Sequence, residues 1–169
     1  MKSGIDKLLL MLKQIYLLIF CVLMSSIVSA EQKLDIRPYE ASDVCSTDIA
    51  QVRVSVNNVG EGGILTVELY HDPDNFLSKK GRSRRIRIPA LSESHRVCFG
   101  IEVEGTYAVA AYHDIDANRK LKKRWNMMPK EPFGLSQNPK LKMGFPKFSN
   151  SAFTTDNTGA NIEINLRKP

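Results

Sequence analysis

The sequence is poor in cysteine and histidine, with three of each in 169 residues, and beyond residue 30 it lacks helical periodicity. No segment there repeats its apolar side chains at the roughly 3.6-residue spacing of an amphipathic helix, which argues against a helical domain. The Gly-x-Ser-x-Gly motif of many serine hydrolases is also missing. Nucleophilic catalysis through that motif is therefore without support.

The first thirty residues have the pattern of a secretory signal peptide. Three lysines give a positive start, an apolar run follows, and small residues at Val28 and Ala30 precede the polar residue Glu31. We therefore expect cleavage after Ala30 and export to the periplasm or the extracellular space. The alternative is a retained membrane anchor, because the apolar run approaches the length that spans a bilayer.

Residues 31–169 have a length suited to a single domain with one core. They contain 21 basic and 17 acidic residues, and the basic ones concentrate in Lys79–Arg87 and Arg119–Arg124. Such clusters attract anionic lipid, acidic glycan or nucleic acid. Because an exported protein seldom meets nucleic acid, we expect an anionic surface or an unidentified envelope ligand as the partner. Membrane contact is expected only through the leader before its cleavage. The alternation of arginine with isoleucine in Arg84–Pro89 also indicates the solvated face of a strand.

Cys45 and Cys98 are the cysteines that remain once the leader is removed. In an oxidising compartment two cysteines most simply form one disulfide. Such a bridge would stabilise the fold by roughly 4 kcal/mol through its restriction of the unfolded chain. Two buried free thiols are the alternative.

Short segments of alternating polarity follow one another along the chain, separated by turn sequences rich in glycine, asparagine and aspartate. In the first, three valines point one way and polar residues the other, so we expect each strand to bury one face. The pattern predicts an all-β antiparallel sandwich of about seven strands. The expected strands are Gln51–Val56, Ile64–Tyr70, Arg84–Pro89, His95–Ile101, Thr106–Tyr112 and Asn161–Leu166.

The segment from Ile115 to Phe148 shows no sustained alternation. It contains four prolines and four aromatic residues. An irregular segment of this length is uncommon inside a compact domain and is usually functional or disordered. The aromatic side chains argue against disorder, because they must be buried or presented to a partner. The segment is either a packed loop that covers one end of the sandwich or a ligand-binding loop.

The start of this segment has the spacing of a calcium loop. Asp114, Asp116 and Asn118 supply oxygen ligands at the first, third and fifth positions. Arg119 stands where such a loop needs glycine, however, and Trp125 stands where it needs a late carboxylate. We therefore favour a polar turn over a Ca²⁺ site and expect no cofactor.

The sequence Tyr112-His113-Asp114 repeats Tyr70-His71-Asp72. If the two triplets met at one edge of the sandwich, their histidines and aspartates could ligate zinc or copper and support a metal-dependent enzyme. We favour a binding or structural module of the cell envelope without catalytic residues, with its site at the sheet end beside the long loop. The candidate ligand-binding residues are Tyr112, His113, Asp114, Trp125, Phe133, Ser136 and Asn138, which combine aromatic and polar groups as small-ligand sites do.

Several motifs resemble a known family. The stretches LTVELYHDPDNFL, GTYAVAAYHDIDANRKL and PKEPFGLSQNP are similar to those of the bacterial family catalogued as domain of unknown function 2141. The resemblance covers about residues 45–167. It implies an exported protein with a strand pattern like immunoglobulin-like and transthyretin-like sandwiches, and it implies no activity. Relatives usually carry glycine or a small polar residue at Arg119 and often an acidic group at Lys122.

Overall fold

A computed structural model describes residues 11–15, 33–125, 127–140 and 145–168. The chain divides into two units, Met1–Lys33 and Leu34–Pro169. In the first unit residues 11–15 are helical, and the expected cleavage site after Ala30 lies outside the described residues. Among the residues that are described, no helix is long and apolar enough to cross a membrane.

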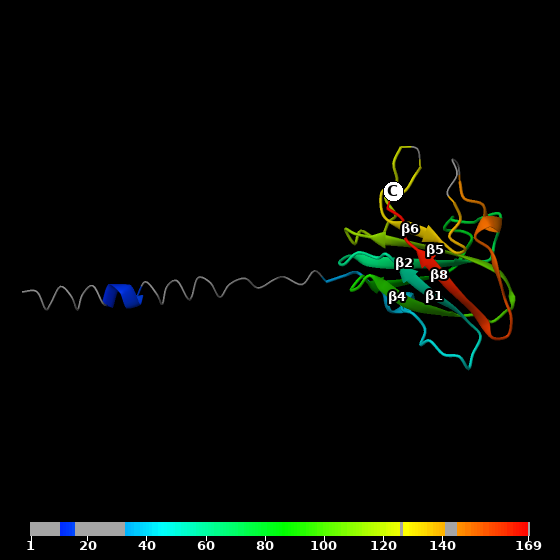
Figure 1. Ribbon diagram of the computed structural model, residues 1–169, viewed down its shortest axis with the longest axis horizontal. Coiled ribbons are helices and arrows are strands. Elements are labelled where there is room, and N and C mark those ends of the chain that lie inside the picture. Colours follow the sequence, from blue (N-terminus) through cyan, green and yellow to red (C-terminus); the bar gives the residue numbers. More distant parts are fainter. Residues whose placement is uncertain (1–10, 16–32, 126, 141–144, 169) are drawn as a thin grey trace, which may run out of the picture. The chain divides into compact units, whose positions relative to one another are not determined.

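The second unit is a β-sandwich of two sheets (Figure 1), which confirms the expected all-β class. The three-stranded sheet has the order β4-β1-β8, with β1 antiparallel to β4 and parallel to β8. The five-stranded sheet has the order β3-β2-β5-β6, and β7 pairs with the first part of β5. The strands are β1 (Gln51–Asn57), β2 (Ile64–Tyr70), β3 (Arg82–Pro89), β4 (Ser94–Gly100), β5 (Gly105–Asp114), β6 (Phe133–Leu135), β7 (Phe153–Thr155) and β8 (Gly159–Asn165).

The core between the sheets follows the alternation of the sequence. Val52, Val54 and Val56 of β1 are fully buried and belong to the same cluster as Val67 of β2 and Val109 of β5. Burial of each such side chain contributes roughly 1.5–3 kcal/mol to folding. Both hydrophobic clusters of the described residues and the disulfide lie within the second unit, so this unit has the means to fold without the first.

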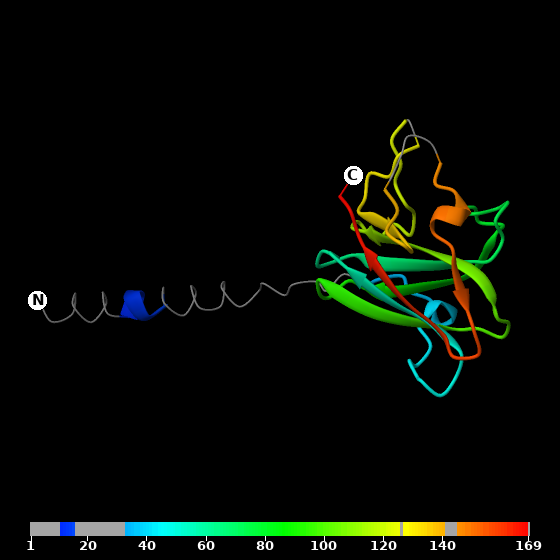
Figure 2. The same cartoon turned by 45° about the vertical axis from the view of Figure 1, so that its right-hand side comes forward.

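The five-stranded sheet differs from the expectation that each strand buries one face. All seven residues of β2 are buried. Its outer face carries a second hydrophobic cluster that includes Tyr70, Ala110, Leu135 and Phe148. The segment 115–148 lies over this outer face, on the side away from the three-stranded sheet (Figures 1 and 2), and so covers a face of the sandwich rather than an end. The expectation is wrong for β2 because this covering segment is distant in sequence.

The disulfide between Cys45 and Cys98 is confirmed, with a Cα–Cα distance of 5.4 Å. It fastens the segment before β1 to β4. The Gln51 side chain adds to this attachment, because its amide accepts a hydrogen bond from the Ser46 backbone and donates one to the Val44 carbonyl, both at 2.9 Å. Gln51 is buried as a result, although its position in the strand had indicated a solvated side chain.

Candidate functional site

A cavity of about 560 Å³ lies between the outer face of the five-stranded sheet and the segment 115–148. This volume falls within the range of sites that hold small molecules. The floor comes from β2, β3, β5 and β6, and the roof from residues 119–129 with Phe145 and Pro146. Apolar lining side chains include Tyr70, Leu77, Ala110, Tyr112, Leu121, Met127, Phe133, Leu135 and Phe145.

The charged side chains that line the cavity are strongly unbalanced. Among the described lining residues Glu68 is the single carboxylate. Six cationic side chains line the same space: Lys79, Arg82, Arg85, Arg119, Lys120 and Lys123. The cavity is therefore apolar in most of its wall and positive in its charge, a combination that favours an anion with an apolar body.

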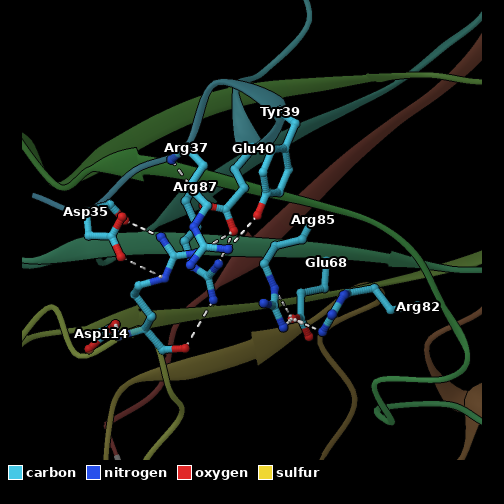
Figure 3. Close-up of polar contacts among 10 residues, drawn as sticks. Asp35, Arg37, Tyr39, Glu40, Glu68, Arg82, Arg85, Arg87 and Asp114 are labelled. Carbon is cyan, nitrogen blue, oxygen red and sulfur yellow. Dashed lines mark hydrogen bonds and ion pairs between the residues drawn. The ribbon is translucent and has the colours of Figure 1, made fainter.

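Glu68 organises the charged part of the floor (Figure 3). Its Oε1 accepts hydrogen bonds from Arg82 Nη1 at 2.9 Å and from Arg85 Nε at 2.7 Å. Its Oε2 accepts one from the Tyr70 hydroxyl at 2.6 Å. One carboxylate thus balances one of two guanidinium charges. Within the described part of the chain, Arg82 Nη2 and Arg85 Nη1 have no hydrogen-bond partner, so both remain available as donors to a ligand.

Tyr70 stays a neutral donor in this arrangement. Burial raises the pKa of its hydroxyl well above the ordinary value, and the negative charge of Glu68 and the hydrogen bond to it raise the pKa further. The tyrosine therefore fixes the carboxylate of Glu68 without adding charge to the cavity.

A second charged group attaches the roof of the cavity to the sheet (Figure 3). Arg87 of β3 is 1% exposed and pairs with Glu40, which is 3% exposed and ends the short 3-10 helix η1 (Pro38–Glu40). Glu40 also accepts a hydrogen bond from Arg119 Nη2 at 2.9 Å, and Arg87 donates to the Arg119 carbonyl at 3.1 Å. One buried carboxylate thereby joins the segment before β1, strand β3 and the start of the roof.

The structure brings two of the seven candidate ligand-binding residues to the cavity, Tyr112 and Phe133. Ser136 and Asn138 instead make structural hydrogen bonds. The buried Ser136 hydroxyl accepts from the Val109 backbone at 2.9 Å and donates to the Ser151 carbonyl, while Asn138 bonds to the β8 backbone at Glu163 and Asn165.

The other three candidates lie elsewhere. His113 points to the opposite face from Tyr112, where its Nε2 lies 2.6 Å from the Gly62 carbonyl oxygen. Trp125 is 96% exposed. Asp114 is buried beside the turn that follows β5, where its carboxylate accepts hydrogen bonds from the backbone of Asn118 at 3.1 Å and of Arg119 at 2.6 Å.

The turn after β5 contains an acidic cluster. Carboxylate oxygens of Asp114, Asp116 and Glu131 all lie within 4.8 Å of one another, a spacing that would allow them to share one cation. Asn118, the third expected ligand, accepts a hydrogen bond from the Lys120 backbone at 2.9 Å. Glu131 was missed, because it follows the loop by more residues than the calcium pattern allows.

Lys122 supplies a positive charge to this cluster through an ion pair with Asp116. Burial raises the pKa of Asp114 and that of Glu131, and the neighbouring carboxylates raise both further, while backbone hydrogen bonds oppose the rise. Asp116 differs, because the hydrogen bond from Lys122 lowers the pKa of its carboxyl. Arg119 adopts a φ of 67°, the left-handed conformation that glycine adopts most easily. The backbone therefore turns at the position where the calcium-loop pattern calls for glycine.

The two Tyr-His-Asp triplets lie at opposite ends of the sheet, so the alternative in which they meet at one edge is wrong. β2 and β5 are antiparallel, with Leu65 opposite His113 and Tyr70 opposite Ala108. His71 follows Tyr70, and its ring lies 6.3 Å from that of Tyr107. Because Tyr107 and His113 are six residues apart on one strand, about 20 Å separates the two histidines. They cannot share a metal ion.

The polar floor of the cavity was not predicted from the sequence; it is formed by Glu68, Tyr70, Arg82 and Arg85. Alternation placed Arg85 on a strand face that was taken as solvated. One signal was available in the sequence, since Thr66, Glu68 and Tyr70 place three polar groups on one face of a strand whose other residues are apolar. The register that sets Glu68 opposite Arg85 could not be read from the sequence.

The comparison with known protein families matches residues 52–163 to the family described as uncharacterized protein conserved in bacteria, domain of unknown function 2141. No curated protein and no solved structure matches the chain. The matched residues begin in β1 and end in β8, and so include both sheets and most of the residues around the cavity. The chain therefore belongs to this bacterial family of uncharacterized proteins.

Proposed function

We propose that the protein is an exported binding module of the bacterial envelope and that its cavity takes a small amphipathic anion. The acidic group of the ligand, a carboxylate or a phosphate, lies against Arg82 and Arg85. Its apolar body lies along Tyr70, Ala110 and Leu135. The observation that carries the proposal is the lining of the cavity, where one carboxylate faces six cations in an otherwise apolar wall.

The proposed location rests on two features. The first thirty residues have the pattern of a cleaved leader. The disulfide between Cys45 and Cys98 supports a protein that works in an oxidising compartment, because such bridges are rare where thiols are kept reduced.

Isothermal titration calorimetry on residues 31–169 tests the ligand class. The probes are decanoate, monodecyl phosphate, 1-decanol and decyltrimethylammonium, each below its aggregation concentration. We expect at least one of the two anions to bind, and neutral decanol to bind about tenfold more weakly or worse, because it lacks charge-assisted hydrogen bonds to the arginines. Equal affinity for decanol would contradict the role of the charge, and no binding of any probe would contradict the proposal.

Two substitutions in the floor should move the affinity in opposite directions. Arg85→Met removes a donor and leaves Glu68 paired with Arg82 alone, so anion binding should weaken about tenfold or more. Glu68→Gln removes the competing carboxylate and should strengthen it. Arg96→Met, at an exposed position on β4, is the matched control and should change nothing. The same direction of change for Arg85→Met and Glu68→Gln would count against the assignment.

A further inference from the structure

Part of the roof of the cavity forms a short hairpin, described at residues 120–125 and 127–130, that projects from the sheet (Figures 1 and 2). Its two arms are held by backbone hydrogen bonds, from Lys130 N to the Lys122 carbonyl and from Arg124 N to the Met128 carbonyl, both at 2.7 Å. Trp125 follows directly after the paired Arg124. We call residues 120–125 and 127–130 the basic hairpin.

Large apolar side chains are exposed on the basic hairpin and beside it. Trp125 is 96% exposed, Phe145 66% and Met127 51%. Lys123 Nζ lies 5.9 Å from the centre of the Phe145 ring, so Phe145 belongs to the same surface as the hairpin. Exposure of a whole indole ring in water is unfavourable, and several such side chains together indicate a surface that a partner covers.

The charges around these side chains have one sign. Lys120, Lys123, Arg124, Lys130 and Lys147 are exposed in the same part of the chain. The described acidic residues of the segment 115–148 are Asp116, which pairs with Lys122, and Glu131, which is 4% exposed. Within the segment 115–148, the exposed apolar side chains are thus accompanied by exposed cations, while the described carboxylates are either paired or buried.

Tryptophan among lysine and arginine is the composition of segments that lie at the surface of an anionic bilayer. The indole ring suits the headgroup region, where one edge is wet and the other apolar, and the cations attract anionic lipid headgroups. A protein partner would offer carboxylates in a fixed arrangement, whereas a bilayer surface requires only cations beside an exposed indole ring and other apolar side chains.

We propose that the basic hairpin and Phe145 dock on the surface of an anionic lipid bilayer, with Trp125 in the headgroup region and Lys123 and Arg124 against the lipid phosphates. This proposal differs from the expectation that membrane contact occurs only through the leader before its cleavage. The same surface adjoins the cavity, because Lys120, Lys123 and Met127 also line it. The inference stands on the exposed residues and does not depend on what the cavity binds.

Trp125 allows a direct test, because it is the single tryptophan of the chain. Residues 31–169 are mixed with vesicles of phosphatidylglycerol and phosphatidylcholine in equal amounts, or of phosphatidylcholine alone. We expect the tryptophan emission to shift to shorter wavelength with the anionic vesicles only, and to be quenched by brominated acyl chains near the headgroups. An unchanged emission spectrum, or equal shifts with both vesicles, would overturn the proposal.

Vesicle co-sedimentation then compares variants. Lys123→Gln with Arg124→Gln should weaken binding about 25-fold, at roughly fivefold for each cation near the surface. Trp125→Ala should weaken it about tenfold. The matched controls are Arg96→Gln with Lys168→Gln for charge and Leu91→Ala for an exposed apolar residue, all at exposed positions outside the hairpin.

Two further outcomes would overturn the proposal. If the charge control lowers binding as much as the hairpin variant, net charge rather than the hairpin drives binding and the proposal fails. Retention on heparin without any vesicle binding would identify an acidic glycan as the partner and would also overturn it. Arg85→Met should bind vesicles as the unmodified protein does, which separates failure here from failure of the proposed ligand site.

Discussion

Glu40 is the residue at which the N-terminal segment, β3 and the roof of the cavity meet. Its carboxylate pairs with Arg87 and Arg119, and both Glu40 and Arg87 are almost fully buried. Burial alone would raise the pKa of Glu40, but the hydrogen bond from the Arg37 backbone and the charges of the two arginines outweigh it and lower the pKa. The ionised form is therefore the one that the fold stabilises.

Removal of this charge should be costly. Glu40→Gln leaves Arg87 as a buried cation without a counter-ion, and we expect a loss of about 3 kcal/mol in the free energy of unfolding. Urea unfolding at pH 7, followed by circular dichroism, measures it. Because the pKa of Glu40 is lowered, its contribution should be complete above the ordinary carboxyl pKa and should disappear as the pH falls through the folded-state value. Glu104→Gln, at an exposed position, is the control, and an equal effect of both variants would contradict this account.

Glu131 should behave in the opposite way. Burial and the charges of Asp114 and Asp116 raise its pKa, so the folded protein binds this proton more tightly than the unfolded chain does. Stability from this group is greatest below its ordinary pKa and is lost as the pH rises through the raised value.

The matching variant is Glu131→Gln, which keeps an oxygen acceptor for the Lys122 backbone. At pH 7 we expect this variant to unfold at higher urea concentration than the unmodified protein. The difference should shrink as the pH is lowered toward about 4, where the glutamate itself becomes protonated. A difference that is constant across this range, as expected for the exposed control Glu104→Gln, would contradict the sign of the shift.

At the scale of elements, the long strands could be predicted and the short ones could not. The six expected strands are present with ends that shift by two residues at most, because each carries a clear apolar alternation. β6 and β7 have three residues each, too few for a periodic signal. β6 exists because the long segment returns to pair Phe133–Leu135 with Ala110–Tyr112. That pairing is a property of the tertiary fold.

The site could be predicted only in part, because some of its residues are brought together by the tertiary fold. Aromatic residues pointed to Tyr112 and Phe133, which do line the cavity. His113 was included because it lies at the same sheet end as Tyr112, but neighbouring residues of a strand face opposite ways. The polar floor depends on a cross-strand pairing of Glu68 with residues 14 and 17 positions later, and no local pattern reveals it.

The disulfide is the element-scale connection that can be tested most simply. It closes a sequence separation of 53 residues between the segment before β1 and β4. Replacement of both Cys45 and Cys98 by alanine should lower the free energy of unfolding by about 4 kcal/mol, mainly because the unfolded chain becomes less restricted. Urea unfolding measures the loss. A loss below about 1 kcal/mol, or two titratable thiols in the natively isolated protein, would contradict the account.

At the scale of the whole molecule, the site is created by the side chains and the loop segment that pack on the outer face of the five-stranded sheet. The outer face of the five-stranded sheet is covered at one side by the cluster of Tyr70, Phe76 and Phe148, whose rings meet edge to face at 5.3 and 5.5 Å. Beside that cluster, the cavity separates the segment 115–148 from the sheet. The basic hairpin forms part of its roof, so a single irregular segment shapes the cavity and carries the surface proposed to meet lipid.

The most direct test of the central claim is a crystal structure of residues 31–169 grown with the anion that binds most tightly in the calorimetric series. We expect the acidic group within hydrogen-bond distance of Arg82 and Arg85, with the alkyl chain against Tyr70 and Leu135. Density for the ligand at another place, or an empty cavity at saturating ligand, would contradict it.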